Sequence, residues 1–180
     1  SIAGLNTNLQ EGLAAAERVF QVLDVEPEIR DRPDARPLAP KGGEIRFENV
    51  RFAYRAGKPA LDGVSLVVPA GRTVSLVGPS GGGKSTILNL IPRFYDVDGG
   101  RVLVDGADVR GLTLASLRGA IALVSQEVSL FDDTVRANIA YGRFGADEEE
   151  IIAAAKAAAA HDFIMALPEG YDTRVGEHGL

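Results

Sequence analysis

The sequence predicts an α/β fold, and three observations support that prediction. A short apolar run at 74–77 precedes a glycine-rich loop, and apolar residues at helical spacing follow the loop, which gives the order strand, loop, helix. Alternating apolar residues before the loop indicate antiparallel strands, and a βαβ pattern comes after it. The chain has 180 residues, of which 46% are hydrophobic and 24% charged, so we expect one soluble globular domain with its own core.

The first 43 residues lead into that domain. Apolar residues recur every three or four positions and predict an amphipathic helix over residues 2–23: Leu5, Leu9, Leu13, Ala16, Phe20 and Leu23. Four prolines follow among charged residues, and because proline blocks helices and removes a backbone donor, we expect an extended linker over 25–43. The core is expected to start after this linker. Because the chain begins without Met and without a signal peptide, we expect it to be a piece of a longer protein.

The core elements are expected in chain order. Residues 44–54 alternate, with one break at Glu48 and Asn49, and residues 66–68 lead into a turn, so both segments are predicted as antiparallel strands. Asp147 and Glu150 have the spacing of a capping box and predict an alanine-rich helix from Glu148 to about Ala160. The remaining expected elements are a strand at 74–77, a helix through 87–91, a strand at 101–104, a short helix at 114–117 and a buried strand at 121–124.

Composition excludes several classes of function. The formal net charge is −6 and the sequence pI is about 5.0, without the basic stripe of a nucleic-acid-binding surface, so no nucleic-acid partner is expected. The chain has no Cys and only two His, which leaves no disulfide, thiolate nucleophile or cysteine-ligated zinc. The longest uncharged stretch, residues 73–83, is far shorter than the roughly 20 apolar residues that a spanning helix needs.

The glycine-rich loop matches the phosphate-binding pattern G-x-x-x-x-G-K-[ST], and it lies after an expected strand and before an expected helix, as its mechanism requires. This phosphate loop consists of Gly78, Pro79, Ser80, Gly81, Gly82, Gly83, Lys84 and Ser85. Glycines let successive backbone N–H groups point inward at an anion, and the start of the helix adds its positive end. We expect Lys84 to reach the β- and γ-phosphates, Ser85 to ligate Mg²⁺ and Thr86 to donate to the α-phosphate.

Other motifs must identify the reaction, because this loop does not distinguish a kinase, a GTPase, a motor or a transporter ATPase. The alternative to phosphate binding is that the segment is a glycine-rich turn without a ligand. Taken together, the segments resemble the ATP-binding cassette (ABC) family, specifically the nucleotide-binding domains of exporters that join a membrane domain and an ATPase in one chain. The segments that carry the resemblance are IRFENVRFAY at 45–54, LDGVSLVV at 61–68, GPSGGGKST at 78–86, RVLVDGADVR at 101–110 and VSQEVSLFDDTVRANIAYG at 124–142.

The resemblance implies a P-loop NTPase core with an antiparallel β subdomain and the start of a helical subdomain, incomplete at the C-terminus before the family's LSGGQ signature. It also implies a division of the chain into four parts. These are the cytoplasmic end of the last transmembrane-domain helix at 1–24, the linker at 25–43, the β subdomain and phosphate-loop core at 44–126, and the Q-loop exit with the start of the helical subdomain at 127–180.

The resemblance also implies roles for single residues. Tyr54 occupies the position of the aromatic residue that stacks on adenine, although on strand propensity alone it is an ordinary half-buried aromatic. Gln126 resembles the Q-loop glutamine, which touches Mg²⁺ and the attacking water, and its alternative is a surface amide at a strand end. Residues 127–131 and Glu177 would face coupling helices of the membrane domain. His161 and His178 lie away from the family's switch histidine and are expected to have no part in the chemistry.

The implied function is ATP binding and hydrolysis, coupled to export of a substrate at the cytoplasmic face of the inner membrane. ATP and Mg²⁺ would be bound, and the partners would be a transmembrane domain of the same chain and a second nucleotide-binding domain. No LSGGQ, Asp-Glu strand or switch His follows Gln126, so this piece is expected to be soluble, to bind ATP and to hydrolyse it poorly. The alternatives are a soluble ABC-type ATPase without a membrane domain, a nucleotide-binding module without catalysis and, more remotely, a small-molecule kinase.

Overall fold

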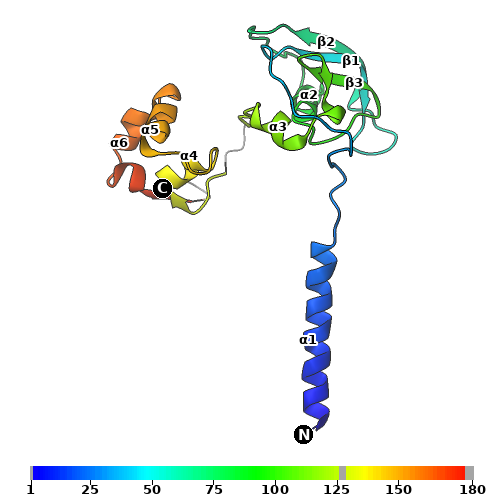
Figure 1. The fold of residues 1–180 in the computed structure, drawn as a ribbon, viewed down its shortest axis with the longest axis vertical. Coiled ribbons are helices and arrows are strands. Elements are labelled where there is room, and N and C mark those ends of the chain that lie inside the picture. Colours follow the sequence, from blue (N-terminus) through cyan, green and yellow to red (C-terminus); the bar gives the residue numbers. More distant parts are fainter. Residues whose placement is uncertain (1, 126–128, 177–180) are drawn as a thin grey trace. The chain divides into compact units, whose positions relative to one another are not determined.

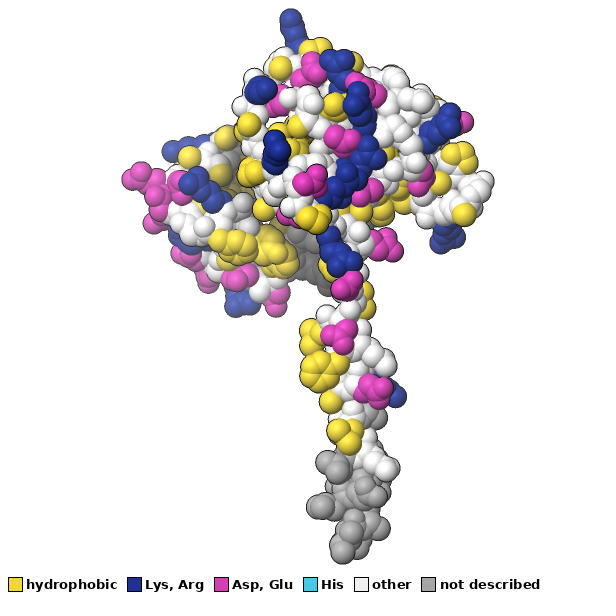
Figure 2. Space-filling view, turned by 45° about the vertical axis from the view of Figure 1, so that its right-hand side comes forward, with side chains coloured by type: hydrophobic (Ala, Val, Ile, Leu, Met, Phe, Trp, Pro, Cys, Tyr) yellow, Lys and Arg dark blue, Asp and Glu magenta, His cyan; other side chains and the backbone are white. Residues whose placement is uncertain are grey.

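The computed structural model describes residues 2–125 and 129–176, and it divides the chain into two compact units, residues 1–122 and 123–180 (Figure 1). The first unit begins with helix α1 (Ile2–Leu23), which confirms the predicted amphipathic helix. Figure 2 shows hydrophobic side chains along one side of the described part of α1 and acidic side chains on another. Val19 and Phe20 of this helix are exposed. Among the described helices, none combines the length and the apolar character needed to cross a membrane.

The linker over 25–43 has no helix or paired strand, as predicted, but its second half packs on the core. Arg36 forms an isolated parallel bridge with Leu112, and Leu38 lies against the buried cluster. The packed core therefore includes residues that precede the expected start of the domain at residue 44.

A four-stranded antiparallel sheet forms the body of the first unit, in the order β2-β1-β3-β4. Its strands are β1 (Ile45–Phe52), β2 (Leu61–Val68), β3 (Gly99–Val104) and β4 (Ala107–Asp108). The sheet confirms the strands predicted at 44–54 and 101–104, and the strand predicted at 66–68 begins earlier, at Leu61. The predicted break in the first strand is an irregularity in pairing between Phe47 and Val50, where Asn49 has a φ of 47°.

Short helices cover this sheet and complete the core. They are α2 (Lys84–Leu90), a 3₁₀ turn at Val109–Gly111 and α3 (Leu114–Gly119), which confirms the predicted helices at 87–91 and 114–117. Ile87 and Leu90 of α2 are buried in one cluster with Phe47 and Val50 of β1. The helix that follows the phosphate loop is therefore held directly against the sheet.

Two predicted strands, at 74–77 and at 121–124, are wrong. Neither segment forms a strand, and Val77 and Val124 are 89% and 90% exposed. A strand needs a neighbour to pair its N–H and C=O groups, and no segment among residues 2–125 and 129–176 pairs with either run. The expected βαβ pattern is consequently not formed in the described part of the chain.

The second unit is mostly helical. It contains α4 (Val135–Ala140), α5 (Glu148–Ala157), α6 (His161–Met165), a 3₁₀ turn at Gly170–Asp172, and a two-stranded pair formed by β5 (Asp133–Thr134) and β6 (Arg174–Val175). The capping box of Asp147 and Glu150 is present as predicted. The helix ends at Ala157 and not at Ala160, because Ala159 adopts a left-handed φ of 54° that stops it.

A carboxylate fastens the end of the linker to the sheet. Asp105, in the turn between β3 and β4, accepts hydrogen bonds from the backbone N–H groups of Lys41, Gly43 and Glu44 at 2.7, 2.8 and 2.9 Å. The bond from Lys41 is the largest cause that holds the pKa of Asp105 below its ordinary value, and burial opposes it. The ionised form of Asp105 is therefore favoured by the folded state.

We expect Asp105→Asn to flatten the loss of stability in acid. The pKa of this carboxyl is lower in the folded state than in the unfolded state, where it is about 3.9. The ionised carboxyl therefore stabilises the fold fully above about pH 3.9, and this stabilisation is lost as the pH falls through the pKa of the folded state. Asparagine tolerates the φ of 50° at this position, so the change removes mainly the charge. Circular-dichroism melts should show a lower Tm than wild type at pH 7 and a smaller further decrease between pH 5 and pH 3. An acid limb as steep as that of the wild type would contradict this role.

Candidate functional site

The phosphate loop is closed and depends on glycine at its last turn. Gly83 has a φ of 82°, and a Cβ built there would lie 2.7 Å from Leu61 Cδ2 and 2.9 Å from the carbonyl oxygen of Ala60. Gly81, with a φ of 78°, also adopts the left-handed region. The loop thus turns tightly against the start of β2, and residue 83 admits no side chain without displacement of that strand.

The Lys84 side chain folds back over the loop. Its Nζ donates hydrogen bonds to the carbonyl oxygens of Gly78 and Pro79, at 2.9 and 2.8 Å. These two bonds join the end of the loop to its beginning and hold a positive charge above its backbone. An anion that enters the loop therefore meets a cation already in place.

The start of α2 supplies hydrogen-bond donors. The first helical bond at this end runs from the N–H of Ile87 to the carbonyl oxygen of Gly83, at 2.9 Å. The earlier N–H groups of the first turn have no acceptor within the helix, as at every helix start. They lie beside the Lys84 ammonium and the exposed Ser85 side chain, whereas Thr86 is 6% exposed.

This donor set fits a chain of phosphates. It consists of backbone N–H groups, one ammonium and the hydroxyls of Ser80, Ser85 and Thr86, and carboxylate is absent from residues 78–86. The residues also fit Mg²⁺, because this ion keeps several waters and takes few protein oxygens when it binds a nucleotide. Ser85, which is exposed in the first turn of α2, stays the predicted protein ligand of this ion. Among the described residues no cluster of three or more His, Cys, Asp or Glu could hold a metal ion by itself.

Tyr54 lies two residues beyond the end of β1 and is 49% exposed. Its ring makes edge contacts with Phe52 and Tyr95, at centroid distances of 4.8 and 5.1 Å. The N–H of Ala60 donates to the carbonyl oxygen of Phe52 at 2.8 Å, and Ala60 is the residue that Gly83 approaches. The end of β1 and the phosphate loop are thus neighbours, and the joint use of Tyr54 and the loop by one nucleotide stays a prediction.

Sequence reasoning missed the residues that support Tyr54. A cavity of about 660 Å³ lies beside its ring and is lined by Phe94, Tyr95 and Asp96, and by Glu28 and Ile29 of the linker. The adjacent aromatic residues Phe94 and Tyr95 directly after a predicted helix were the available signal. The contribution of the linker had no signal, because it depends on a contact between distant parts of the chain.

Several predicted site residues lie outside the described residues. These are Gln126, Glu127 and Glu177, and His178, which is expected to have no part in the chemistry, also lies outside them. Gln126 is therefore not brought together with Lys84 and Ser85 here. His161 is described, and its Nδ1 lies 2.9 Å from the hydroxyl of the buried Tyr171.

An exposed aromatic cluster lies in the second unit, shortly after the predicted Q-loop. The rings of Phe131 and Tyr141 are 4.4 Å apart, and Phe144 lies 5.4 Å from Tyr141. Their exposed fractions are 54%, 55% and 83%. The Asn138 side chain accepts from the N–H of Phe131 and donates to its carbonyl oxygen, at 2.9 and 3.0 Å, which fixes this segment on α4. Exposed apolar groups of this size are typical of a contact surface.

Known proteins are similar to nearly the whole chain. A family model described as ABC transporter matches residues 61–177. The ATP-dependent lipid A-core flippase of Syntrophus aciditrophicus (strain SB) is 51% identical over 178 residues, which are 99% of this chain and 30% of that protein. The mitochondrial iron-sulfur clusters transporter ATM1 of Gibberella zeae is 50% identical over 173 residues, which are 96% of this chain and 25% of that protein.

A solved structure is also similar. The structure of a bacterial Atm1-family ABC exporter with ATP bound matches with a TM-score of 0.87 and 48% identity, over 93% of this chain and 29% of that chain. The predicted fold class is thereby confirmed. The chain spans less than a third of the length of these relatives.

Proposed function

The chain belongs to the ABC transporter family, and from this membership we propose that it is the ATP-binding part of an exporter that couples ATP binding and hydrolysis to transport of a substrate across a membrane. The observation that carries the proposal is the closed phosphate loop, with Lys84 held over its carbonyl groups and the start of α2 open to an anion. The exporters among its relatives support the transport part of the proposal.

The residues of the loop would bind and orient the nucleotide. Lys84 would leave the loop carbonyls for the β- and γ-phosphates, where its charge opposes the negative charge that develops in phosphoryl transfer. The first N–H groups of α2 would hold the phosphates in one orientation, with Thr86 at the α-phosphate. The Ser85 hydroxyl would be the protein ligand of Mg²⁺, which would supply positive charge to offset the negative charge of the phosphates.

Hydrolysis needs more than phosphate binding. Because phosphoryl transfer depends mostly on positioning, a group must orient the attacking water, and we assign this role to Gln126 by family resemblance. The 180 residues lack an LSGGQ sequence. We therefore propose that they bind ATP by themselves but hydrolyse it slowly.

The partners would be a transmembrane domain of the same chain and a second nucleotide-binding domain, at the cytoplasmic face of the membrane. The contact with coupling helices would involve residues 127–131 and Glu177. The exposed cluster of Phe131, Tyr141 and Phe144 supports this proposal, because it offers an apolar surface next to the first of these segments. Hydrophobic spans encoded upstream of Ser1 would support the exporter, whereas a gene without such spans would contradict it.

Tyr54→Ala should weaken ATP binding by about 5- to 150-fold, because stacking of a base on an aromatic ring contributes about 1–3 kcal/mol and this ring is half exposed and open to a base. Displacement of a fluorescent ATP analogue by Mg·ATP measures the effect. Tyr54→Phe keeps the ring and should retain the affinity, and Tyr141→Ala in the other unit is the matched control. Equal affinities for Tyr54→Ala and wild type would overturn the assignment of the base to this ring.

A further inference from the structure

Arg93 is a buried cation that nucleotide binding alone does not explain. It lies three residues after the end of α2, is 2% exposed and has a φ of 54°. Its Nε and Nη2 donate to the two carboxylate oxygens of Asp96, at 2.7 and 3.0 Å. Its Nη1 is buried and has no hydrogen-bond partner among the described residues. A buried charge is costly unless all its polar atoms are paired, so the unpaired Nη1 adds to the free-energy cost of burying Arg93.

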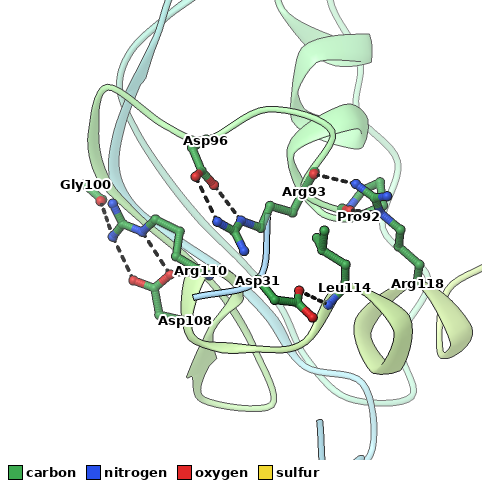
Figure 3. Close-up of polar contacts among 9 residues, drawn as sticks. All are labelled: Asp31, Pro92, Arg93, Asp96, Gly100, Asp108, Arg110, Leu114 and Arg118. Carbon is green, nitrogen blue, oxygen red and sulfur yellow. Dashed lines mark hydrogen bonds and ion pairs between the residues drawn. The ribbon is translucent and has the colours of Figure 1, made fainter. Parts of the chain in front are cut away.

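The segment around Arg93 is fastened to helix α3. Arg118 of α3 donates from Nε to the carbonyl oxygen of Pro92 and from Nη2 to that of Arg93, at 3.0 and 2.9 Å (Figure 3). Its guanidinium also lies over the Phe94 ring, 5.4 Å from the centroid. The end of α2 and helix α3 therefore form one connected body.

The linker docks on the same body from the other side. Asp31 accepts a hydrogen bond from the N–H of Leu114, the first residue of α3, at 2.7 Å. Further along the linker, the N–H of Arg36 donates to the carbonyl oxygen of Gly111 at 2.9 Å, and the N–H of Leu38 donates to Ser116 Oγ at 2.8 Å. In Figure 3 the Arg93 guanidinium lies between the Asp96 carboxylate and the linker segment that carries Asp31.

Several carboxylates favour the charged form of the Arg93 guanidinium. The pKa of the Arg93 guanidinium is raised, most by its hydrogen bond with Asp96 and against the cost of burial, and the charges of Asp31 and Asp108 raise it further. Asp96 pairs with Arg93, and Asp108 pairs with Arg110 at 2.7 Å. Asp31, by contrast, has no ion pair within the described residues. Arg93 is thus the buried cation that the charge of Asp31 favours, across a distance longer than a direct ion pair.

We propose that Asp31 and Arg93 form an electrostatic latch between the linker and the end of α2, so that docking of the linker and binding of nucleotide at the other end of α2 stabilise each other. The inference rests on the proposed function. Helix α2 has seven residues, with Lys84 and Ser85 at its start and Arg93 just past its end. A linker held at Arg93 restrains α2 and hence the donors at its start. Coupling between two sites is reciprocal, so ATP in turn tightens the linker.

The test compares two carboxylates of the linker in the full 180-residue chain. Asp31→Asn removes the charge but keeps an oxygen that can accept from the N–H of Leu114. Asp34→Asn is the matched control, because Asp34 is exposed and its side chain has no hydrogen bond or ion pair within the described ranges. Two quantities are measured for each variant. They are the affinity for Mg·ATP, by displacement of a fluorescent ATP analogue, and the amide hydrogen exchange of residues 31–38 with and without Mg·ATP.

In wild type, Mg·ATP is expected to slow exchange at the amides of Arg36 and Leu38. Asp31→Asn should bind ATP about 3- to 10-fold more weakly and exchange faster at both amides, and Asp34→Asn should match wild type. Arg93→Gln removes the charge, and combined with Asp31→Asn it should cost less than the sum of the two single changes, as expected for residues that act together.

The outcomes separate the two proposals. ATP binding without any change in linker exchange would overturn the coupling and leave the proposed function intact. If Asp31→Asn matches wild type in both ATP affinity and linker hydrogen exchange, the coupling is likewise overturned and the proposed function is intact. A wild-type chain that binds no ATP would overturn the proposed function and the coupling together.

Discussion

Lys84→Ala is expected to weaken ATP binding by about 10- to 100-fold. A hydrogen bond between an ammonium and a phosphate contributes roughly 1.5–3 kcal/mol, and alanine removes it entirely. In the free chain the same ammonium donates to the carbonyl oxygens of Gly78 and Pro79, so the loop also loses the two bonds that close it. Calorimetric titration with Mg·ATP measures the change in affinity.

The control for this prediction is Lys58→Ala. Lys58 is exposed and lies in the turn between β1 and β2, outside the phosphate loop. The Lys58→Ala variant should bind ATP as the wild type does, and both variants should melt as cooperatively as the wild type. If Lys84→Ala and Lys58→Ala had the same affinity, the loop would not be the phosphate site.

Gly83→Ala is expected to disrupt both the phosphate loop and the start of β2. Its methyl group would lie 2.7 Å from Leu61 Cδ2 and 2.9 Å from a backbone oxygen, and the φ of 82° would add strain. A left-handed residue costs about 1–2 kcal/mol, and overpacking costs about 1–3 kcal/mol more. We therefore expect a loss of roughly 2–5 kcal/mol in the free energy of unfolding, together with loss of ATP binding.

Gly71→Ala separates strain from collision. Gly71 has a φ of 67°, similar to that of Gly83, but a Cβ there meets nothing within 4 Å. The Gly71→Ala substitution should lower the free energy of unfolding by only the backbone strain of about 1–2 kcal/mol and leave ATP affinity unchanged. Denaturant unfolding of the two variants gives both costs. Equal costs would show that the contact with Leu61 and Ala60 plays no part.

Local patterns predicted the elements that are stabilised by neighbours close in sequence. The alternation over 44–54, the helix after the phosphate loop and the capping box at Asp147 all depend on residues within a few positions of one another, and all three are present. The two wrong strands, at 74–77 and 121–124, have apolar composition without a pairing partner among the described residues. Composition does not supply a partner strand, so it misled the prediction there.

The same distinction applies to the site. The phosphate loop was predicted from eight consecutive residues. The structure shows its positive φ angles and the Lys84 ammonium on its carbonyl oxygens, and the contact of Lys84 with phosphates stays a prediction. The role of the linker did not follow from any pattern. Asp31 accepts a hydrogen bond from the N–H of Leu114, which lies 83 positions later in the sequence. Nothing in the sequence distinguishes Arg93 from a surface arginine, although the fold buries it. Contacts of that range become visible only in three dimensions.

The central claim is that residues 78–86 bind the phosphates of a nucleotide, and calorimetric titration of the 180-residue chain with Mg·ATP tests it most directly. We predict binding in the micromolar to millimolar range at one site per chain, and loss of the heat signal in Lys84→Ala under the same conditions. A sample that melts cooperatively but shows no binding of Mg·ATP, or that binds equally well with Lys84 replaced by alanine, would contradict the claim.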